Sequence, residues 1–334
     1  MREIRRRTLQ DVADAAGLSK AATSYALRGI RGSQETREKV RDIAASLGYT
    51  ADPIARALAS GRSGNIAIVG SLRDLWQQDL TVMLSRSLGG RDLSSTIADV
   101  DESPAQEAKV LRALHANQVD GILSIPVDPS ADYWGEVPSS IRVVSIGDAL
   151  PGRPGSSAVL FDNQFGVGTA LRHLADLGHR FVGVLAPSLP TTPGRPAEIL
   201  AETFGRSLGI RVIVSASPAS VSGAADAVTR ILQSDDRPTA LFCLSDSIAF
   251  GAYAAAKAVG LSIPRDLSVL GYDDSEMAAL VTPALSSFSW DEQAIVDAAV
   301  TALTEPAESG DPMPTSVTFR PEFVARESTG HPAH

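Results

Sequence analysis

The sequence has little cysteine, few aromatic residues and no long apolar run. Its 334 residues include a single cysteine, so no disulfide can form within the chain. Cys243 stands between Phe242 and Leu244, and we expect it to be an inert thiol of the core. No stretch approaches the roughly 18 uninterrupted apolar residues of a membrane helix, and the basic N-terminus lacks the apolar run of a signal peptide. We therefore expect a cytoplasmic protein that contacts no membrane.

An overall excess of positive charge is also missing. The formal net charge is -9, which for the chain as a whole argues against a polyanionic partner. The charges are spread unevenly, however: residues 1–62 hold 12 Lys and Arg against 7 Asp and Glu, whereas the remainder carries 18 against 32. This asymmetry suggests a basic head that meets nucleic acid and an acidic body that does not, although a solvated basic face gives the same pattern.

Motifs of several enzyme classes are absent. There is no His-Glu-x-x-His, no cluster of Cys and His at metal-ligand spacing, and no Gly-x-Ser-x-Gly. Gly166 and Gly168 begin a stretch that looks like a dinucleotide-binding loop, but Leu171 stands at the third glycine position and no apolar strand comes directly before it. Helix packing explains these glycines better. We expect no catalytic activity, no metal and no cofactor.

The first fifty residues predict three short helices. Apolar residues recur at helical spacing, and each expected helix has a capping residue before it and a glycine after it. These pairs are Thr8 and Gly17, Ser19 and Gly29, and Ser33 and Gly48. Two short helices joined by a tight turn, with a third packed on them, form a helix-turn-helix.

The rest of the chain predicts an α/β body. Residues 53–64 separate it from the head, and Pro53 opens a helix of about two turns that is too short to be stable alone. Apolar runs then alternate with helical patterns, which predicts parallel sheets with helical crossovers. The runs are 66–69, 121–125, 143–146, 181–185, 240–244 and 267–272. Because the pattern restarts near residue 161, we expect two lobes with a ligand cleft where their strand ends meet.

Several segments in a fixed order resemble the LacI/GalR (lac repressor) family. The segments of the head and hinge are 8–13, 16–19, 36–40, 47–49 and 55–58. Those of the body include 119–121, 162–163, 177–180, 245–246 and 271–274. The resemblance covers about residues 8 to 325 and implies a two-lobed core like that of periplasmic binding proteins, with two parallel sheets. The implied limits are 1–52 for the helix-turn-helix head, 53–64 for the hinge helix, 65–161 with 290–318 for the N-lobe, and 162–289 with 319–328 for the effector-binding C-lobe.

The second helix of such a head enters the major groove of DNA. By motif position, Lys20 and Ala21 occupy the family's two main base-reading places, and Tyr25 occupies a third. For Lys20, a plain solvent-facing role is nearly as good an interpretation. An exposed aromatic such as Tyr25 is harder to explain without a partner. Phosphate contacts are expected from Arg7, Thr8, Ser19, Ser24 and Arg28.

The hinge carries a further expectation. In the family, two hinge helices pair in the minor groove and a Leu from each wedges into the central base step, and the matching residue here is Leu58. Ala55 would let the two helices approach closely. The alternative is that Leu58 packs against the body, but the flanking Arg56 and Arg62 favour the wedge.

Candidate effector contacts follow the strands of the body. A carboxylate beside an aromatic face suits a sugar, whose hydroxyls donate to the carboxylate while its apolar face stacks on the ring. The candidates are Asp74, Trp76, Phe161, Asp246 and Asp273, with Arg195 added by the resemblance. Capping of the next helix is an equally good interpretation for Asp246 and Asp273. Trp290 is expected either to line the cleft or to seal the core.

Together these features predict a homodimeric transcriptional regulator, most simply a repressor, that binds a palindromic operator in the nucleoid. A small-molecule effector, expected to be a sugar or a sugar derivative, would control it from the cleft between the lobes. Dimers could also pair into tetramers. The alternatives are a two-lobed solute-binding protein and an α/β enzyme, neither of which would bind DNA.

Overall fold

The computed structural model describes residues 7–27, 29–49, 63–117, 119–187, 196–305 and 315–333. The chain divides into two compact units, residues 1–63 and 64–334, and each is described by itself. Nearly all of the predicted hinge lies outside the described residues. The same holds for four predicted contact residues: Arg28, Ala55, Leu58 and Arg195.

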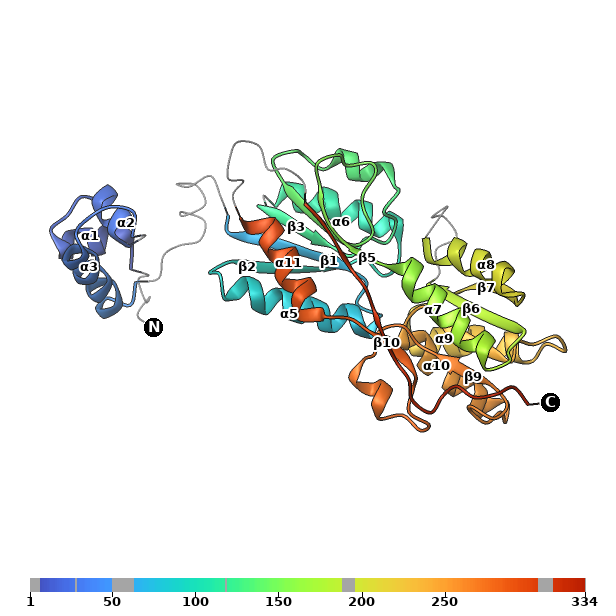
Figure 1. Ribbon diagram of the computed structural model, residues 1–334. Coiled ribbons are helices and arrows are strands. Elements are labelled where there is room, and N and C mark those ends of the chain that lie inside the picture. Colours follow the sequence, from blue (N-terminus) through green and yellow to red (C-terminus); the bar gives the residue numbers. More distant parts are fainter. Residues whose placement is uncertain are drawn as a thin grey trace, which may run out of the picture. The chain divides into compact units, whose positions relative to one another are not determined.

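The first unit is the predicted bundle of three helices (Figure 1). They are α1 (Leu9–Ala16), α2 (Lys20–Leu27) and α3 (Gln34–Ser46). Thr8 and Asp11 cap α1 reciprocally, because the Thr8 hydroxyl accepts from the Asp11 amide at 3.3 Å and the Asp11 carboxylate accepts from the Thr8 amide at 2.7 Å. Gly17 ends α1 with φ of 71°, as predicted. Small side chains on facing sides of the helices form the core: Val12, Ala16, Ala26, Val40 and Ala44.

The N-lobe of the second unit contains a parallel sheet with the strand order β11-β5-β4-β3-β1-β2 among the described residues. Its strands are β1 (Asn65–Gly70), β2 (Ser94–Asp99), β3 (Gly121–Ser124), β4 (Arg142–Gly147), β5 (Ser157–Phe161) and β11 (Ser316–Phe319). Its helices are α5 (Leu75–Gly89), α6 (Pro104–Ala116), η1 (Asp132–Glu136) and α11 (Glu292–Thr304). One apolar cluster joins one face of the sheet to α5 and α11, and another joins the opposite face to α6 and η1.

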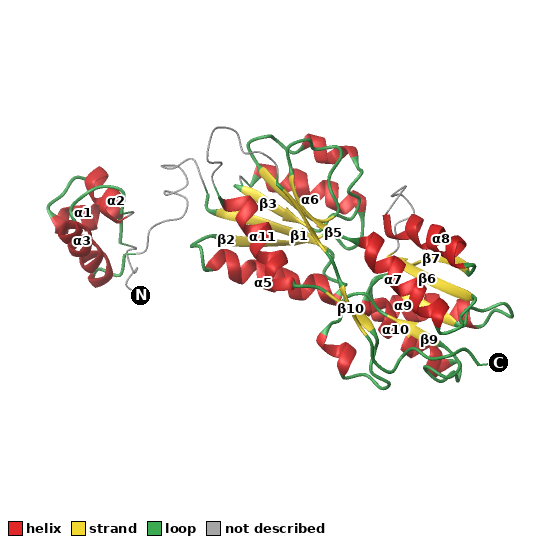
Figure 2. Cartoon of the chain, viewed as in Figure 1, coloured by secondary structure: helices red, strands yellow, loops and turns green. Residues whose placement is uncertain are grey.

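The C-lobe repeats this layered design around a parallel sheet with the order β7-β6-β8-β9 (Figure 2). Its strands are β6 (Phe181–Pro187), β7 (Arg211–Ser217), β8 (Ala240–Cys243) and β9 (Ser268–Leu270). Its helices are α7 (Asn163–Asp176), α8 (Pro196–Leu208), α9 (Val221–Leu232), α10 (Asp246–Ala258) and η2 (Glu276–Ala279). Helices α9 and α10 pack on one face of the sheet and α7 and α8 on the other, and Cys243 is buried as expected.

The chain passes between the lobes after β5, after β10 (Ser287–Ser289) and after β11. The last passage leads to β12 (Glu322–Val324), which pairs antiparallel with β10. Every apolar run predicted as a strand coincides with one: β1, β3, β4, β6, β8 and β9. None of the helices in the described residues is long and apolar enough to cross a membrane.

Gly166 is explained by close packing, as expected, and belongs to helix α7. A Cβ atom at this position would lie 1.9 Å from the hydroxyl oxygen of Tyr272, so no larger residue fits while that ring keeps its place. Tyr272 in turn donates to Asn163 at 3.2 Å. Both Tyr272 and Asn163 line the pocket between the lobes, so the glycine serves the wall of that pocket.

Candidate functional site

The exposed side of α2 gathers most of the predicted base-reading residues. Lys20, Ala21 and Tyr25 are exposed, with Tyr25 36% accessible. The Arg31 guanidinium lies 5.4 Å from the centroid of the Tyr25 ring. Ser24 is half-buried on the same helix. The apolar side of α2 packs in the core of the bundle, so the opposite, polar side of the helix is available to a partner.

The predicted phosphate contacts lie at the starts of two helices. Arg7 and Thr8 are exposed before α1. Ser19 is exposed before α2, and its hydroxyl accepts from the Ala22 amide at 3.2 Å. The free backbone amides of a helix start favour an anionic group such as phosphate. The geometry of the head is therefore suited to a nucleic-acid backbone at the starts of α1 and α2 and to base edges along the exposed side of α2.

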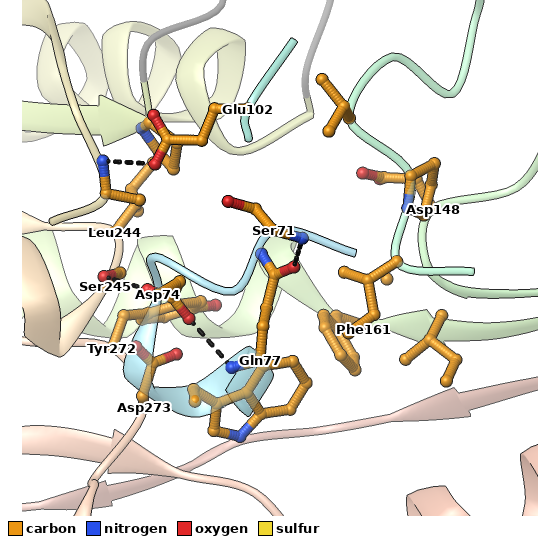
Figure 3. Close-up of a pocket in the computed structure, with 18 of the residues that line it drawn as sticks. Ser71, Asp74, Gln77, Glu102, Asp148, Phe161, Leu244, Ser245, Tyr272 and Asp273 are labelled. Carbon is orange, nitrogen blue, oxygen red and sulfur yellow. Dashed lines mark hydrogen bonds between the residues drawn. The ribbon is translucent and has the colours of Figure 1, made fainter. Parts of the chain in front are cut away.

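In the second unit, a pocket lies between the two lobes, at the carboxyl ends of their strands (Figure 3). The empty space at this point is about 1120 Å³, including the part that is open to solvent. The polar residues that line it are Ser71, Asp74, Gln77, Glu102, Asp148, Asn163, Ser245 and Asp273. The aromatic residues are Trp76, Phe161, Tyr272 and Trp290. This is the usual ligand position in α/β proteins with parallel sheets.

The aromatic side chains form a continuous wall. Phe161 lies between Trp76, at a centroid distance of 5.6 Å, and Trp290, at 4.4 Å. The rings of Trp290 and Tyr272 pack in a T-shaped arrangement at a centroid distance of 5.7 Å, and the indole nitrogen of Trp290 donates to the Tyr272 carbonyl at 3.2 Å. Trp290 packs against core clusters of both lobes and also lines the pocket, so both of its expected roles are realised. Rings of this kind offer an apolar face to a bound molecule.

Asp74 joins the lobes directly. One of its oxygens caps α5 by accepting from the Gln77 amide at 3.1 Å, and the other accepts from the Ser245 hydroxyl of the C-lobe at 2.8 Å. Beside it, the Leu75 amide donates to the Ser247 hydroxyl at 3.0 Å. Burial raises the pKa of Asp74 because a carboxylate loses its hydration there.

A second N-lobe carboxylate reaches across the cleft in the same way. Glu102 accepts from the backbone amide of Ala219, in the C-lobe, at 2.8 Å. Its backbone is left-handed, with φ of 53°, and burial raises its pKa. The hydrogen bonds of Asp74 and Glu102 therefore depend on the orientation of the two lobes relative to each other. A ligand in the pocket could change that orientation.

Asp273 lines the pocket, and its Oδ2 accepts from the backbone amide of Asp246 at 2.8 Å. Burial, and after it the charges of Asp74 and Asp246, raise the pKa of Asp273 well above its usual value. Asp273 does not cap the next helix, η2, because the N-cap of η2 is Ser275; the amide that it does accept from is the first one of α10. Asp273 therefore lines the pocket and also holds the start of α10, but it does not cap the helix that follows it in sequence.

Asp246 requires a correction. It is 1% exposed and is not part of the pocket wall. Its carboxylate instead accepts from the Tyr272 amide at 3.1 Å, the Ser275 amide at 2.8 Å and the Ser287 hydroxyl at 2.6 Å. Nor does it cap α10, since that position belongs to Ser245. Asp246 therefore organises the loop after β9, and the expected direct contact with a ligand does not follow from its position.

Gly271 fits this arrangement. A Cβ atom on Gly271 would lie 2.0 Å from an oxygen of the Asp246 carboxylate, so the chain needs glycine where the loop passes over the buried acid. The pair fixes the start of the segment that presents Tyr272 and Asp273 to the pocket.

Ser71 is a pocket residue that the sequence did not single out. It follows β1, is 3% exposed, and its amide donates to Gln77 Oε1 at 2.8 Å. Its hydroxyl has no hydrogen-bond partner among the described residues. Figure 3 shows this side chain pointing into the pocket. A buried hydroxyl without a partner is costly, so it marks a place where a bound molecule would be stabilised.

The structure thus brings together Asp74, Trp76, Phe161 and Asp273 of the predicted effector contacts. Sequence analysis missed Ser71, Glu102 and Asp148, although the rule that ligands bind at strand ends, if applied to β2 and β4, points to the last two. Within the described residues, no group of His, Cys, Asp and Glu is arranged to hold a metal ion. Among the described lining residues, the chemistry of the pocket is that of carboxylates, the Ser71 hydroxyl and aromatic faces.

Comparisons with known proteins agree with both units. The profile of bacterial regulatory proteins of the lacI family matches residues 8–52, and that of the periplasmic binding protein-like domain matches residues 171–329. The ribose operon repressor of Haemophilus influenzae is 28% identical over 329 residues, covering 96% of this chain and 98% of that protein. An uncharacterised HTH-type transcriptional regulator in the aml 5′ region of Streptomyces limosus is 30% identical over 334 residues, covering 96% and 94%.

A solved structure supports the fold over the same length. The lac repressor dimer bound to operator and the anti-inducer ONPF superposes with a TM-score of 0.80 at 23% identity, covering 98% of this chain and 100% of that one. At this identity the likeness bears on the fold, and it agrees with a three-helix head followed by a two-lobed α/β body.

Proposed function

Because the chain belongs to the LacI family of bacterial transcriptional regulators, we propose that it acts as a homodimeric repressor that binds a palindromic operator. A sugar or sugar derivative bound between its lobes would control its affinity for that operator. The observation that carries this proposal is the interlobe pocket, where N-lobe carboxylates meet C-lobe donors beside an aromatic wall. Catalysis is not part of the proposal, since the family consists of regulators.

The proposed DNA contacts follow the exposed sides of the head. Lys20, Ala21 and Tyr25 would read base edges, while phosphates would be held by Arg7, Thr8, Ser19, Ser24 and Arg28. Ala55 and Leu58 would act in the minor groove. The exposure of α2 and of the helix starts supports the first two groups. The roles of Arg28, Ala55 and Leu58 rest on sequence similarity alone.

The proposed division of the chain is a head of residues 1–52, a hinge of 53–64, an N-lobe of 65–161 with 290–318, and a C-lobe of 162–289 with 319–328. The points at which the chain passes between the two sheets support the lobe limits.

The two half-sites of an operator would bind two identical heads, since a two-fold dimer matches a palindrome. Such a protein would act in the cytoplasm, at the nucleoid.

Control follows from linkage. An effector that favours one arrangement of the two lobes would make or break the interlobe hydrogen bonds of Asp74 and Glu102. The free-energy difference between the two arrangements would then change the affinity for DNA. A coupling of roughly 1 to 3 kcal/mol changes operator affinity about 5- to 150-fold. Asp74, Trp76, Phe161 and Asp273 are the proposed effector contacts, and Arg195 is added from the resemblance.

The test begins with selection of bound duplexes from a random pool, followed by fluorescence anisotropy on the selected site. We expect a palindromic site whose affinity falls steeply with salt, as phosphate contacts require. Ribose is the first effector to add, because a similar protein is a ribose operon repressor, and hexoses and nucleosides follow. A protein that binds no duplex at low salt would be a solute-binding protein or an enzyme instead, and the proposal would be rejected.

A further inference from the structure

The turn after α2 is held in a fixed form. Gly29 follows the helix with a left-handed φ of 72°, a conformation that favours glycine. Its amide donates to the Ala26 carbonyl at 3.1 Å, and the Ile30 amide donates to the Tyr25 carbonyl at 3.0 Å. These two hydrogen bonds form the Schellman motif, which closes the end of a helix. The position of the chain after Gly29 is therefore fixed relative to α2.

The same turn is held from its other end. The Ser33 hydroxyl caps α3 by accepting from the Thr36 amide at 3.2 Å. Arg31 lies between the two helix ends, and its guanidinium lies 5.4 Å from the centroid of the Tyr25 ring. Both residues are exposed. The fold of the head thus places a cation beside Tyr25, although the two residues are separated in sequence.

The contact with Tyr25 leaves the Arg31 guanidinium able to bind another group. The face of an aromatic ring attracts a cation electrostatically, and this attraction uses none of the N–H donors of arginine. The contact also restricts the orientations of a long side chain, so less conformational entropy is lost when the guanidinium binds a partner. Arg31 is therefore oriented in part before a partner binds.

The position of this cation favours bases over phosphates. Tyr25 follows Ala21 by one helical turn, so the two lie on the same exposed side of α2. Arg7, Thr8 and Ser19, which we expect to hold phosphates, lie instead at the helix starts. A guanidinium beside the base-reading residues can donate to O6 and N7 of a guanine, which its planar fork matches.

We propose that Arg31 is a further base-reading residue, which donates a pair of hydrogen bonds to a guanine in each half-site of the operator. Tyr25 keeps its own proposed contact and, through its ring, also orients the Arg31 guanidinium. The inference rests on the function proposed above and adds a residue that determines which operator is bound. Lysine in place of Arg31 keeps the charge but lacks the paired donors.

The test uses the full-length protein. Duplexes are selected from a random pool with the parent, Arg31→Ala and Arg31→Lys, and affinities are then measured by fluorescence anisotropy. We expect the parent to prefer G·C over A·T at one symmetric position by about 10-fold or more per half-site, the size of a good bidentate contact. Both substitutions should remove most of that preference. Arg31→Lys should bind random duplex as tightly as the parent, because it keeps the charge.

Two controls separate base reading from charge and from the Tyr25 hydroxyl. Lys39→Ala removes one positive charge from an exposed position of α3 and should leave every base preference unchanged. Tyr25→Phe keeps the ring and should retain the guanine preference, whereas Tyr25→Ala should reduce it. Loss of this preference in Tyr25→Phe as well would refute the orienting role of the ring.

The outcomes separate this inference from the proposed function. A palindromic site that Arg31→Ala selects with unchanged base preferences would overturn the inference and leave the proposed function standing. An equal loss of affinity on all duplexes, restored in Arg31→Lys, would do the same, because it indicates a phosphate contact. A parent protein that binds no duplex at low salt would overturn both. If Arg31→Ala fails to fold, as followed by circular dichroism, Arg31→Lys decides.

Discussion

Replacement of Asp246 by alanine tests the role that the structure gives this residue. The buried carboxylate accepts from the amides of Tyr272 and Ser275 and from the hydroxyl of Ser287. Asp246→Ala leaves these three donors without an acceptor, at about 1 to 3 kcal/mol each. The substitution also removes a carboxylate that is costly to bury, as its raised pKa indicates, and this gain offsets part of the cost. We expect a net loss of about 3 kcal/mol.

A loss of that size is large against the roughly 5 to 15 kcal/mol that stabilise a typical domain. It corresponds to a fall of about 6 to 12 °C in the unfolding midpoint, at 2 to 4 °C per kcal/mol for a domain of this class of size. The assay is thermal unfolding followed by circular dichroism, supported by urea titration. The exposed Asp235→Ala serves as control and should change stability by less than about 0.5 kcal/mol.

The two interpretations of Asp246 give different results. If it organises the loop after β9, Asp246→Ala lowers stability and weakens ligand binding only as a consequence. If it contacts the ligand directly, binding is lost while the unfolding midpoint stays that of the parent. An Asp246→Ala midpoint equal to that of Asp235→Ala would refute the role of this carboxylate in holding the loop.

Three further substitutions extend these tests. Tyr25→Ala should weaken binding to the selected operator by about 1 to 3 kcal/mol and binding to random duplex much less, because the exposed Tyr25 ring is not part of the core of the bundle. Equal losses of affinity for both duplexes, measured by fluorescence anisotropy, would contradict a base-reading role. Asp273→Asn should stabilise the free protein at pH 7 by about 1 kcal/mol. Because burial raises the pKa of Asp273 in the folded state, the parent should gain stability as the pH is lowered from 7 toward 5, and a variant with the same pH dependence in urea titrations would contradict this. Glu107→Ala should cost about 2 to 4 kcal/mol, since the fully buried carboxylate holds the amides of Val127 and Asp128 at 3.0 and 3.2 Å; thermal unfolding at the parent's midpoint would show that the loop does not need it.

Much of the fold could be predicted from local patterns. Helix caps and stops act over a few residues, so Thr8 and Gly17 predicted α1 correctly. Central strands are covered on both faces and appear as apolar runs, which is how β3 and β8 were recognised. A strand with no buried side chains carries no such signal. Strand β2 reads SSTIAD, and all of its positions are exposed or half-buried, so it was missed for that reason.

The pocket was predicted only in part, for a related reason. Strand ends named Asp74, Phe161 and Asp273, because each follows a recognisable strand or restart of the pattern. Glu102 follows the unrecognised β2, and its role depends on the Ala219 amide of the other lobe, 117 residues away. Asp246 and Asp273 both follow strands and look alike in sequence, yet one is turned into the loop and the other lines the pocket.

The sequence by itself determined the helices of the head, the six strands that are apolar runs and the uneven charge between head and body, because these depend on periodicity and composition along the chain. Only the tertiary structure decided which acidic residues line the pocket and which one holds a loop. It alone also placed the Ser71 hydroxyl in the pocket without a hydrogen-bond partner among the described residues. Those properties are set by two lobes that fold from alternating segments and meet at their strand ends. No local pattern in the chain records that meeting.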